Sequence, residues 1–313
     1  MAKQTTLPVK TEPPASPIAF ARHETFHPRF GWLKKGYDRA AANAHIFLDE
    51  DAPVQLGVGK NMVRSIRYWC QAFKLLANDQ PTDFGERLLG DRGWDPYLED
   101  PASLWLLHWQ LLQPPCYATA WDLVFNQLQR VEFTADDLFY ELGDHRDRLP
   151  SSRIADSSIK KDVSCLLRMY AGQTTKGKAS WSEDALDCPF TELRLIQTVG
   201  DARHYGFRIG PKPNLPAEII TYAVLQFAAA QTTTARTITL AQLTYDGGSP
   251  GRVFKLTEAA VWDAIAAVSH TWSELVLEEG AGKLQLSFKT DDPRDLAQEI
   301  LADYYDAQRG QSR

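Results

Sequence analysis

The sequence has no long apolar run and few cysteines. None of its 313 residues falls in an uninterrupted apolar stretch of the ~20 residues that cross a bilayer, so we expect a cytoplasmic protein without a membrane partner. Its four cysteines are scattered, without a C-x-x-C pair, which favours reduced, buried thiols over disulfides or a zinc site. The formal net charge of −6 gives no overall basic character, so a nucleic-acid site must be a local patch.

Local composition divides the chain into a short tail and three helical units. Residues 1-17 are polar and proline-rich, and we predict that they form a disordered tail. The rest of the chain, in a sequence that is 44% hydrophobic, is long enough to bury a sizeable core. We predict a helix-turn-helix-like domain with a basic helix at 18-115, a second helical helix-turn-helix-like domain at 116-200 and a C-terminal winged-helix-like domain at 201-313.

The segment from His23 to His27, HETFH, matches H-E-x-x-H, a pattern typical of zinc proteases. That chemistry requires a continuous helix, because a spacing of four residues places both imidazoles on one face. Pro28 follows at once and disfavours helical geometry at His27, and no third ligand extends the motif. We therefore expect no zinc. The segment is interpreted as a polar loop, either a functional site or an anchor whose aromatic residues enter the core.

Residues 55–76, QLGVGKNMVRSIRYWCQAFKLL, are predicted to contain an amphipathic helix with one basic face. Glycines precede this helix, whose free N–H groups suit a phosphate, and asparagine and arginine side chains suit base edges. The candidate DNA contacts are Lys60, Asn61, Arg64, Arg67 and Lys74; the alternative is a solvated basic face. The G-x-G-K in this stretch lacks the rest of a nucleotide-binding phosphate loop, which excludes an NTPase.

A turn rich in carboxylates lies between two further predicted helices. Asp91, Asp95, Glu99 and Asp100 are close in sequence, and clustered carboxylates can hold a divalent cation. Glu99 and Asp100 are explained equally well as residues that start the apolar helix expected from Ser103, because acidic side chains favour helix N-termini. The sequence leaves both interpretations open.

The second unit follows a break at QPPC. Thr134 is a predicted helix cap within it, and a further helix is expected over residues 157–171. The apolar residues of that helix recur at helical spacing and face inward. Lys160 and Lys161 then lie outside, as further candidate DNA contacts.

The third unit ends in two alternating strands around residues 280–283, which predict a β-hairpin. Three helices followed by a hairpin are typical of a winged helix. The helix in the recognition position, residues 257–268, has no basic residue, so we expect a packing or homodimerisation module with Arg252 and Lys255 as its only candidate DNA contacts. The expected fold class is mainly α with small β-hairpin wings, built from tandem helix-turn-helix and winged-helix-like units.

Four separated sequence blocks resemble one known family. They run from His23 to Asp38, from Leu56 to Trp69, from Asp95 to Trp109 and from Ser249 to Leu256. Together they resemble the uncharacterised protein family that accompanies DNA phosphorothioation genes, over nearly the whole chain after the tail. The resemblance implies the B component of single-stranded phosphorothioation systems, a DNA nickase that acts beside a cysteine desulfurase, an ATPase and a sulfur-transfer enzyme. Double-stranded DNA and those sulfur-transfer and ATPase proteins are then its partners.

No recognised nuclease motif accompanies this resemblance. Hydrolysis of a phosphodiester needs a nucleophile, charge stabilisation and commonly a divalent cation, here Mg²⁺ or Mn²⁺. The polar loop supplies His23 and Glu24 as acid–base candidates and Arg29 and Lys34 as candidate charge stabilisers, while the metal ligands stay unknown. Two alternatives are a non-enzymatic DNA-binding adaptor that recruits the sulfur-transfer proteins, and a winged-helix transcription regulator.

Overall fold

The computed structural model describes residues 16–149, 153–171, 188–201, 203–231, 236–280 and 282–311. Within these ranges the chain is mainly helical with three small antiparallel sheets, which confirms the predicted mainly α class with small β elements. Nearly all of the predicted tail, residues 1-17, lies outside them. No helix of the described ranges is both long and apolar enough to cross a membrane.

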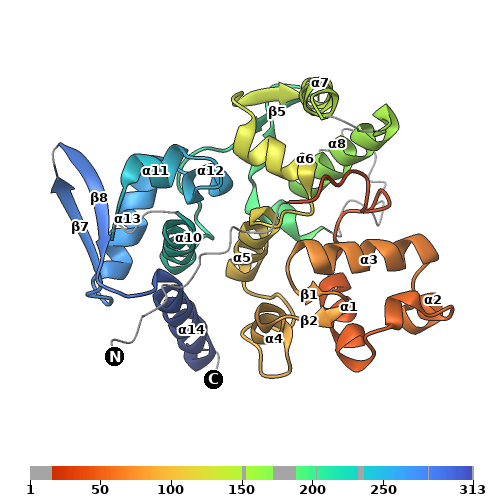
Figure 1. The fold of residues 1–313 in the computed structure, drawn as a ribbon, viewed down its shortest axis with the longest axis horizontal. Coiled ribbons are helices and arrows are strands. Elements are labelled where there is room, and N and C mark those ends of the chain that lie inside the picture. The colour runs from red at the N-terminus through yellow and green to blue at the C-terminus, as the bar shows by residue number, and fades with distance from the viewer. Residues whose placement is uncertain are drawn as a thin grey trace, which may run out of the picture.

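The first part of the chain packs short helices around α3 and α5. Its elements are α1 (Trp32–Ala42), η1 (Ile46–Leu48), α2 (Ala52–Leu56), α3 (Lys60–Ala72), β1 (Leu76–Ala77), β2 (Gln80–Pro81), α4 (Asp83–Leu89) and α5 (Pro101–Leu112). Asp100 caps α5, its carboxylate accepting a hydrogen bond from the Ala102 N–H. Because α5 is apolar on nearly every face, it is a buried helix, and Figure 1 shows it near the centre of the molecule.

The second part combines helices with a three-stranded sheet. Its elements are α6 (Thr119–Asp122), the π-helical turn η2 (Leu123–Gln127), β3 (Glu132–Thr134), α7 (Ala135–Asp147), α8 (Asp156–Tyr170), η3 (Pro189–Leu193), β4 (Ile196–Thr198) and β5 (His204–Phe207). Thr134 forms the predicted cap of α7: its hydroxyl accepts from the Asp137 N–H, and the Asp137 carboxylate accepts from the Thr134 N–H. The strands are antiparallel, in the order β3-β5-β4.

The third part contains the predicted hairpin. Its elements are α10 (Ala217–Ala230), β6 (Thr237–Thr239), α11 (Leu240–Tyr245), α12 (Pro250–Phe254), α13 (Glu258–Ser269), β7 (Leu275–Gly280), β8 (Lys283–Phe288) and α14 (Pro293–Gln311). β7 and β8 pair from Leu275 opposite Phe288 to Gly280 opposite Lys283, which confirms the hairpin. The strand order in the sheet is β6-β8-β7. As in the sheet of the second part, the last strand in the sequence lies in the middle.

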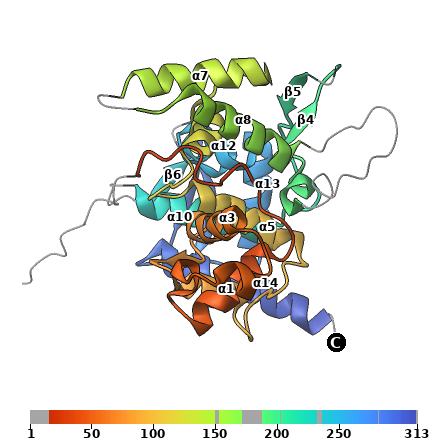
Figure 2. The ribbon, with the colours of Figure 1, turned by 90° about the vertical axis from the view of Figure 1, so that its right-hand side faces the viewer.

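One apolar core joins the three parts, from Trp32 in α1 to Tyr305 in α14. All four cysteines are buried free thiols, as predicted. The chain before α1 crosses this assembly as an extended loop. Figures 1 and 2 show it in red, passing between α3 and α8, which belong to the first and second parts.

Candidate functional site

The candidate site is built on residues 21–28, here named the His23 loop. Its centre is a buried pair in which Nε2 of His23 lies 2.6 Å from Oδ1 of Asp162 on α8. The Ala21 N–H donates to both oxygens of the same carboxylate, at 3.0 and 3.1 Å. His23 is 0% exposed. The pair therefore ties the loop to α8 out of contact with solvent.

The backbone of the His23 loop is strained. Ala21, Glu24 and Thr25 have φ values of 55°, 50° and 72°. This left-handed region costs a residue with a side chain about 1–3 kcal/mol unless its surroundings hold it there. The Arg168 guanidinium on α8 donates to the Thr25 carbonyl at 2.8 Å, and the Trp69 indole on α3 donates to the following carbonyl at 3.0 Å. The loop is thus clamped between the two helices (Figure 2).

Aromatic rings enclose the His23 imidazole. Its centroid lies 6.1 Å from that of Trp69, nearly parallel, and 5.7 Å from that of Trp121, edge to face. Nδ1 of His23 has no hydrogen-bond partner among the described residues. Burial raises the pKa of the Asp162 carboxyl, and the hydrogen bond with His23 opposes that shift. This geometry favours a positioning role for His23 over contact with DNA, and its catalytic role stays a prediction.

Asp162 is the site residue that the sequence analysis missed. It follows Ile159 by three residues and precedes Leu166 by four, on the buried face of α8. A carboxylate at a helical position that is otherwise apolar indicates a buried partner, and this was the available signal. Because His23 is 139 residues away in the sequence, spacing could not identify it as that partner.

Three of the predicted DNA contacts form an exposed group on α3. Lys60, Asn61 and Arg64 lie on its first turns, and we name them the α3 basic end. Gly59 precedes the helix and gives its first N–H groups no side-chain acceptor. Nη1 of Arg64 lies 3.6 Å from Oε1 of Glu24, so the His23 loop stands directly beside this basic end.

The other two predicted contacts of this segment stabilise the fold. Nε and Nη2 of Arg67 donate to the two carboxylate oxygens of Asp79, at 2.8 and 2.6 Å. The Lys74 ammonium donates to the Pro115 carbonyl and lies 4.6 Å from the centroid of the Tyr117 ring. Burial lowers the pKa of Lys74 to about 8. We therefore leave Arg67 and Lys74 out of the proposed DNA surface.

The two predicted charge stabilisers have partners of their own. The Arg29 guanidinium lies 5.4 Å from the centroid of the Trp32 ring. The Lys34 ammonium donates to Oδ1 of Asp38 at 2.7 Å and to the Leu89 carbonyl at 3.1 Å. Within the described ranges, Lys34 makes no hydrogen bond to the His23 loop. The four predicted catalytic side chains are therefore not joined in one hydrogen-bonded cluster.

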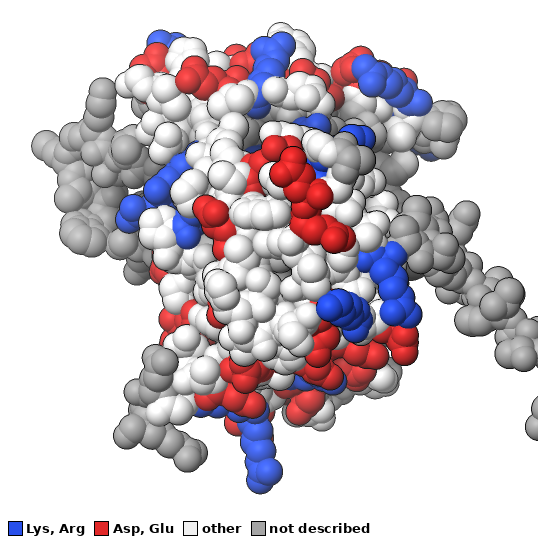
Figure 3. Space-filling model, turned by 90° about the vertical axis from the view of Figure 1, so that its left-hand side faces the viewer, with Lys and Arg blue, Asp and Glu red and all other residues white. Residues whose placement is uncertain are grey.

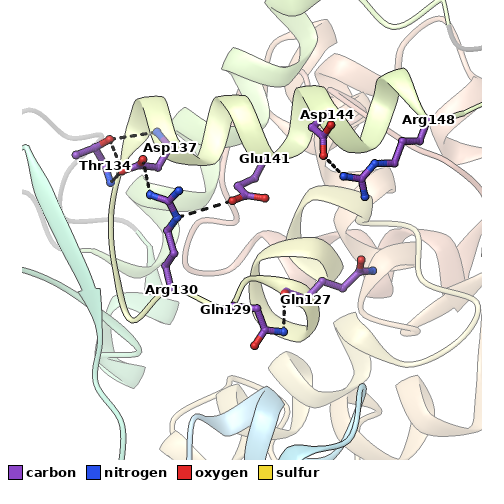
Figure 4. Close-up of polar contacts among 8 residues, drawn as sticks. All are labelled: Gln127, Gln129, Arg130, Thr134, Asp137, Glu141, Asp144 and Arg148. Atoms are coloured by element: carbon purple, nitrogen blue, oxygen red, sulfur yellow. Dashed lines mark hydrogen bonds and ion pairs between the residues drawn. The ribbon is translucent and has the colours of Figure 1, made fainter.

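Basic side chains elsewhere are paired or scattered. Beside α7, Arg130 donates to Asp137 at 2.9 Å and lies 3.8 Å from Glu141, while Arg148 pairs with Asp144 (Figure 4). On the side of the molecule that carries β7 and β8, Lys and Arg are scattered, and Asp and Glu gather along the lower edge (Figure 3). These surfaces are weaker candidates for DNA than the α3 basic end.

The remaining predicted DNA contacts differ in exposure. Lys160 and Lys161 are exposed on α8 and stay predictions. Arg252 is half-buried, and its Nε donates to the Tyr245 carbonyl at 3.0 Å. The prediction that Lys255 contacts DNA is corrected. Lys255 is only 8% exposed, and its ammonium donates to the Phe125 carbonyl at 2.7 Å, so it is not available to DNA.

Lys255 and the neighbouring Lys212 form a buried cationic pair. The Lys212 ammonium donates to the Lys255 carbonyl at 3.0 Å, and the Lys255 ammonium lies 4.0 Å from the centroid of the Phe207 ring. Burial lowers the pKa of Lys255 to about 7 and that of Lys212 to about 8. Unfolded lysines titrate near pH 10.4. Between about pH 7 and that value, the unfolded chain therefore binds more protons than the folded chain does.

Stability is therefore expected to rise as the pH increases from about 7 towards about 10. Lys255→Met keeps an apolar stem of similar length and removes the buried charge. Urea unfolding at several pH values measures this effect. As the pH rises, the free energy of unfolding should increase more for the wild-type protein than for the variant. If the free energy of unfolding changed with pH by the same amount in both proteins, the lowered pKa of Lys255 would be contradicted.

The carboxylate-rich turn before α5 is a capping structure. The Asp95 carboxylate accepts from the N–H groups of Glu99 and Asp100, both at 2.9 Å, and from the Ser103 hydroxyl at 2.7 Å. Asp95 is buried, and these bonds use both of its oxygens. In the part of the chain that the structure describes, no group of three His, Cys, Asp or Glu side chains could hold a metal ion. The helix-start interpretation accounts for this turn.

The chain matches one protein family and is similar to two solved structures. Residues 20–305 match the family described as "Protein of unknown function (DUF4007)". The chain is similar to the solved "SspB crystal structure", with 42% identity and a TM-score of 0.85 over 93% of this chain and 89% of that chain. It is equally similar to the "Magnesium ion-bound SspB crystal structure", with 42% identity and a TM-score of 0.86 over the same shares. No curated protein matches the sequence.

Proposed function

Because this chain belongs to the DUF4007 family, we propose that it is the DNA-binding, strand-nicking component of a DNA phosphorothioation defence system. Support comes from its 42% identity to the solved SspB structure and from the four sequence blocks that resemble the family accompanying DNA phosphorothioation genes. Double-stranded DNA is then the substrate, and the sulfur-transfer and ATPase proteins of the system are partners. A nick opens one strand so that sulfur can replace an oxygen of the backbone.

The observation that carries this proposal is the position of the α3 basic end beside the clamped His23 loop. Lys60 and Arg64 supply positive charge, Asn61 supplies an amide that suits adenine, and the uncapped start of α3 supplies N–H donors. The His23–Asp162 pair ties the loop to α8, and the exposed Lys160 and Lys161 of the same helix are proposed as further phosphate contacts.

The third part of the chain is proposed to serve packing or homodimerisation. Its order of helices followed by the β7–β8 hairpin supports a winged-helix-like interpretation. Its α13, in the recognition position, begins with Glu258 and carries no basic residue. A helix of this charge is a poor match for phosphate, which is why we place the DNA surface on the other parts.

A divalent cation, Mg²⁺ or Mn²⁺, is proposed as a requirement for nicking. The similarity to a magnesium-bound SspB structure supports this proposal. The described residues hold no preformed three-ligand group, so we assign no step to the ion. Within the His23 loop, Glu24 is the carboxylate with solvent access, its side chain being 34% exposed. It is therefore the first candidate for acid–base work at the DNA backbone.

A non-enzymatic adaptor is the second candidate function. It is favoured by the complete burial of His23, which keeps that imidazole from a phosphodiester in this conformation. Such an adaptor would use the same DNA surface and recruit the sulfur-transfer proteins. The two candidates predict the same DNA binding and differ in chemistry.

Nicking of supercoiled plasmid separates the two candidates. The proposed enzyme should produce open circles with Mg²⁺ or Mn²⁺ and none with EDTA. Glu24→Gln should slow nicking by about 10²-fold or more, because it removes an acid–base group while keeping the side-chain shape. Glu279→Gln on β7 is the matched exposed control and should nick at the wild-type rate.

Three results would change this view. Plasmid that stays supercoiled in the presence of protein that still shifts duplex DNA in a gel would support the adaptor. Full activity of Glu24→Gln would remove Glu24 from the chemistry. If folded wild-type protein neither nicks nor binds DNA, the proposed function is refuted.

A further inference from the structure

A hollow of about 410 Å³ lies beside α1 and is here named the Tyr97 hollow. Its polar lining comes from Lys34, Lys35, Asp38 and Arg39 on α1, and from Tyr97, about sixty residues further along the chain. This volume falls in the range of about 300–1,000 Å³ that is usual for small-molecule sites. The DNA surface proposed above does not use it.

The turn before α5 presents the Tyr97 ring to solvent. Tyr97 is 72% exposed, so most of its ring is open to solvent. The turn is fixed because the neighbouring Asp95 is buried and its carboxylate accepts three hydrogen bonds. The backbone on which Tyr97 stands is therefore fixed, and its exposed ring is available for a ligand.

The cations of α1 are arranged around that ring. The Lys34 ammonium lies 5.9 Å from the centroid of the Tyr97 ring. Arg39 is exposed, and its guanidinium makes no hydrogen bond or ion pair within the described ranges. Asp38 is the only carboxylate among the lining residues, and it is paired with Lys34. The hollow thus combines an available aromatic face with an excess of positive charge.

We propose that the Tyr97 hollow binds one unpaired nucleotide of an opened DNA strand, with the base stacked on Tyr97 and the phosphate between Lys34 and Arg39. Base stacking on aromatic rings beside a basic groove is the usual chemistry of single-strand binding. A base inside a duplex is already stacked on both faces, so only an unpaired base fits. A neutral peptide would supply no acceptor charge for Arg39, whereas a phosphate would.

The hollow adjoins the proposed duplex surface. The Lys35 ammonium donates to the carbonyl of Leu56 at 3.1 Å, and Gly57 to Gly59 lead from there directly into the α3 basic end. A strand separated near α3 therefore has a receiving site on the same part of the chain. This inference rests on the proposed function, because it assigns the hollow to the strand that nicking releases.

The test compares a fully paired duplex with a forked duplex that carries 2-aminopurine in its unpaired arm. Tyr97→Ala should weaken binding of the fork by about 5- to 100-fold and leave the paired duplex unchanged, since one stacking contact is lost. Tyr97→Phe should bind both like the wild type, because the ring is kept. Tyr140→Ala is the matched control, since Tyr140 is 71% exposed on α7 and should not affect the fork.

The outcomes separate this inference from the proposed function. Equal binding of the fork by wild type and Tyr97→Ala would refute nucleotide binding in the Tyr97 hollow. It would leave the proposed duplex surface unaffected. Quenching of 2-aminopurine fluorescence by wild type and Tyr97→Phe, lost in Tyr97→Ala, would support it. Binding of the fork that depends on Tyr97, without any binding of paired duplex, would support the hollow and refute the proposed duplex surface.

Discussion

Asp162→Ala is expected to lower the free energy of unfolding by about 3–5 kcal/mol, the usual cost of breaking a buried charged or hydrogen-bonded pair by removing one partner. The substitution leaves the His23 imidazole and the Ala21 N–H without their acceptor in a site closed to water. It also releases the strained loop that the pair ties to α8.

Urea unfolding followed by tryptophan fluorescence measures this effect, because Trp69 and Trp121 enclose His23. Asp162→Asn should lose less, since its amide oxygen still accepts from the loop. Asp263→Ala, an exposed carboxylate on α13, is the control and should change stability by about 0.5 kcal/mol or less. A loss of that small size in Asp162→Ala would show that the buried pair does not hold the loop.

The second large effect is expected on DNA affinity. Replacing both Lys60 and Arg64 with alanine should weaken duplex binding by roughly ten- to hundredfold at low salt, because two phosphate-neutralising charges are lost. The slope of log affinity against log salt should also become shallower by about 2, at about one unit for each lost contact. Fluorescence anisotropy with a labelled duplex over a salt series measures both quantities.

A double substitution of Lys283 and Lys289 with alanine is the matched control. Both lysines are exposed on or beside the β7–β8 hairpin, and their removal changes the net charge by the same two units. This control should keep most of the wild-type affinity and slope. Equal losses in the two double variants would mean that only net charge matters, and would exclude a localised surface at α3.

The local elements of the fold were predictable from the sequence. The basic helix α3, the caps at Asp100 and Thr134, and the β7–β8 hairpin all depend on residues within a few positions of one another. Periodicity and capping chemistry act over that range, so they are visible in a short stretch of sequence. The same reasoning found the three exposed residues of the α3 basic end.

The tertiary pairings were not predictable. Asp162 and His23 are 139 residues apart, and Lys255 meets the Phe125 carbonyl across 130 residues. Arg67 looked like a free cation, because nothing in α3 itself indicates that Asp79 folds back onto it. A basic side chain on a helix can bind DNA or anchor the fold, and only the packed structure distinguishes the two.

The most direct test of the proposed DNA surface is hydrogen–deuterium exchange of the wild-type chain, alone and with duplex DNA. Bound DNA should slow exchange in residues 21–28, the His23 loop, and in residues 57–61, the glycine-rich entry to α3. The hairpin at residues 275–288 should exchange at the same rate in both states. Protection confined to that hairpin, with no change at residues 21–28 and 57–61, would contradict the account.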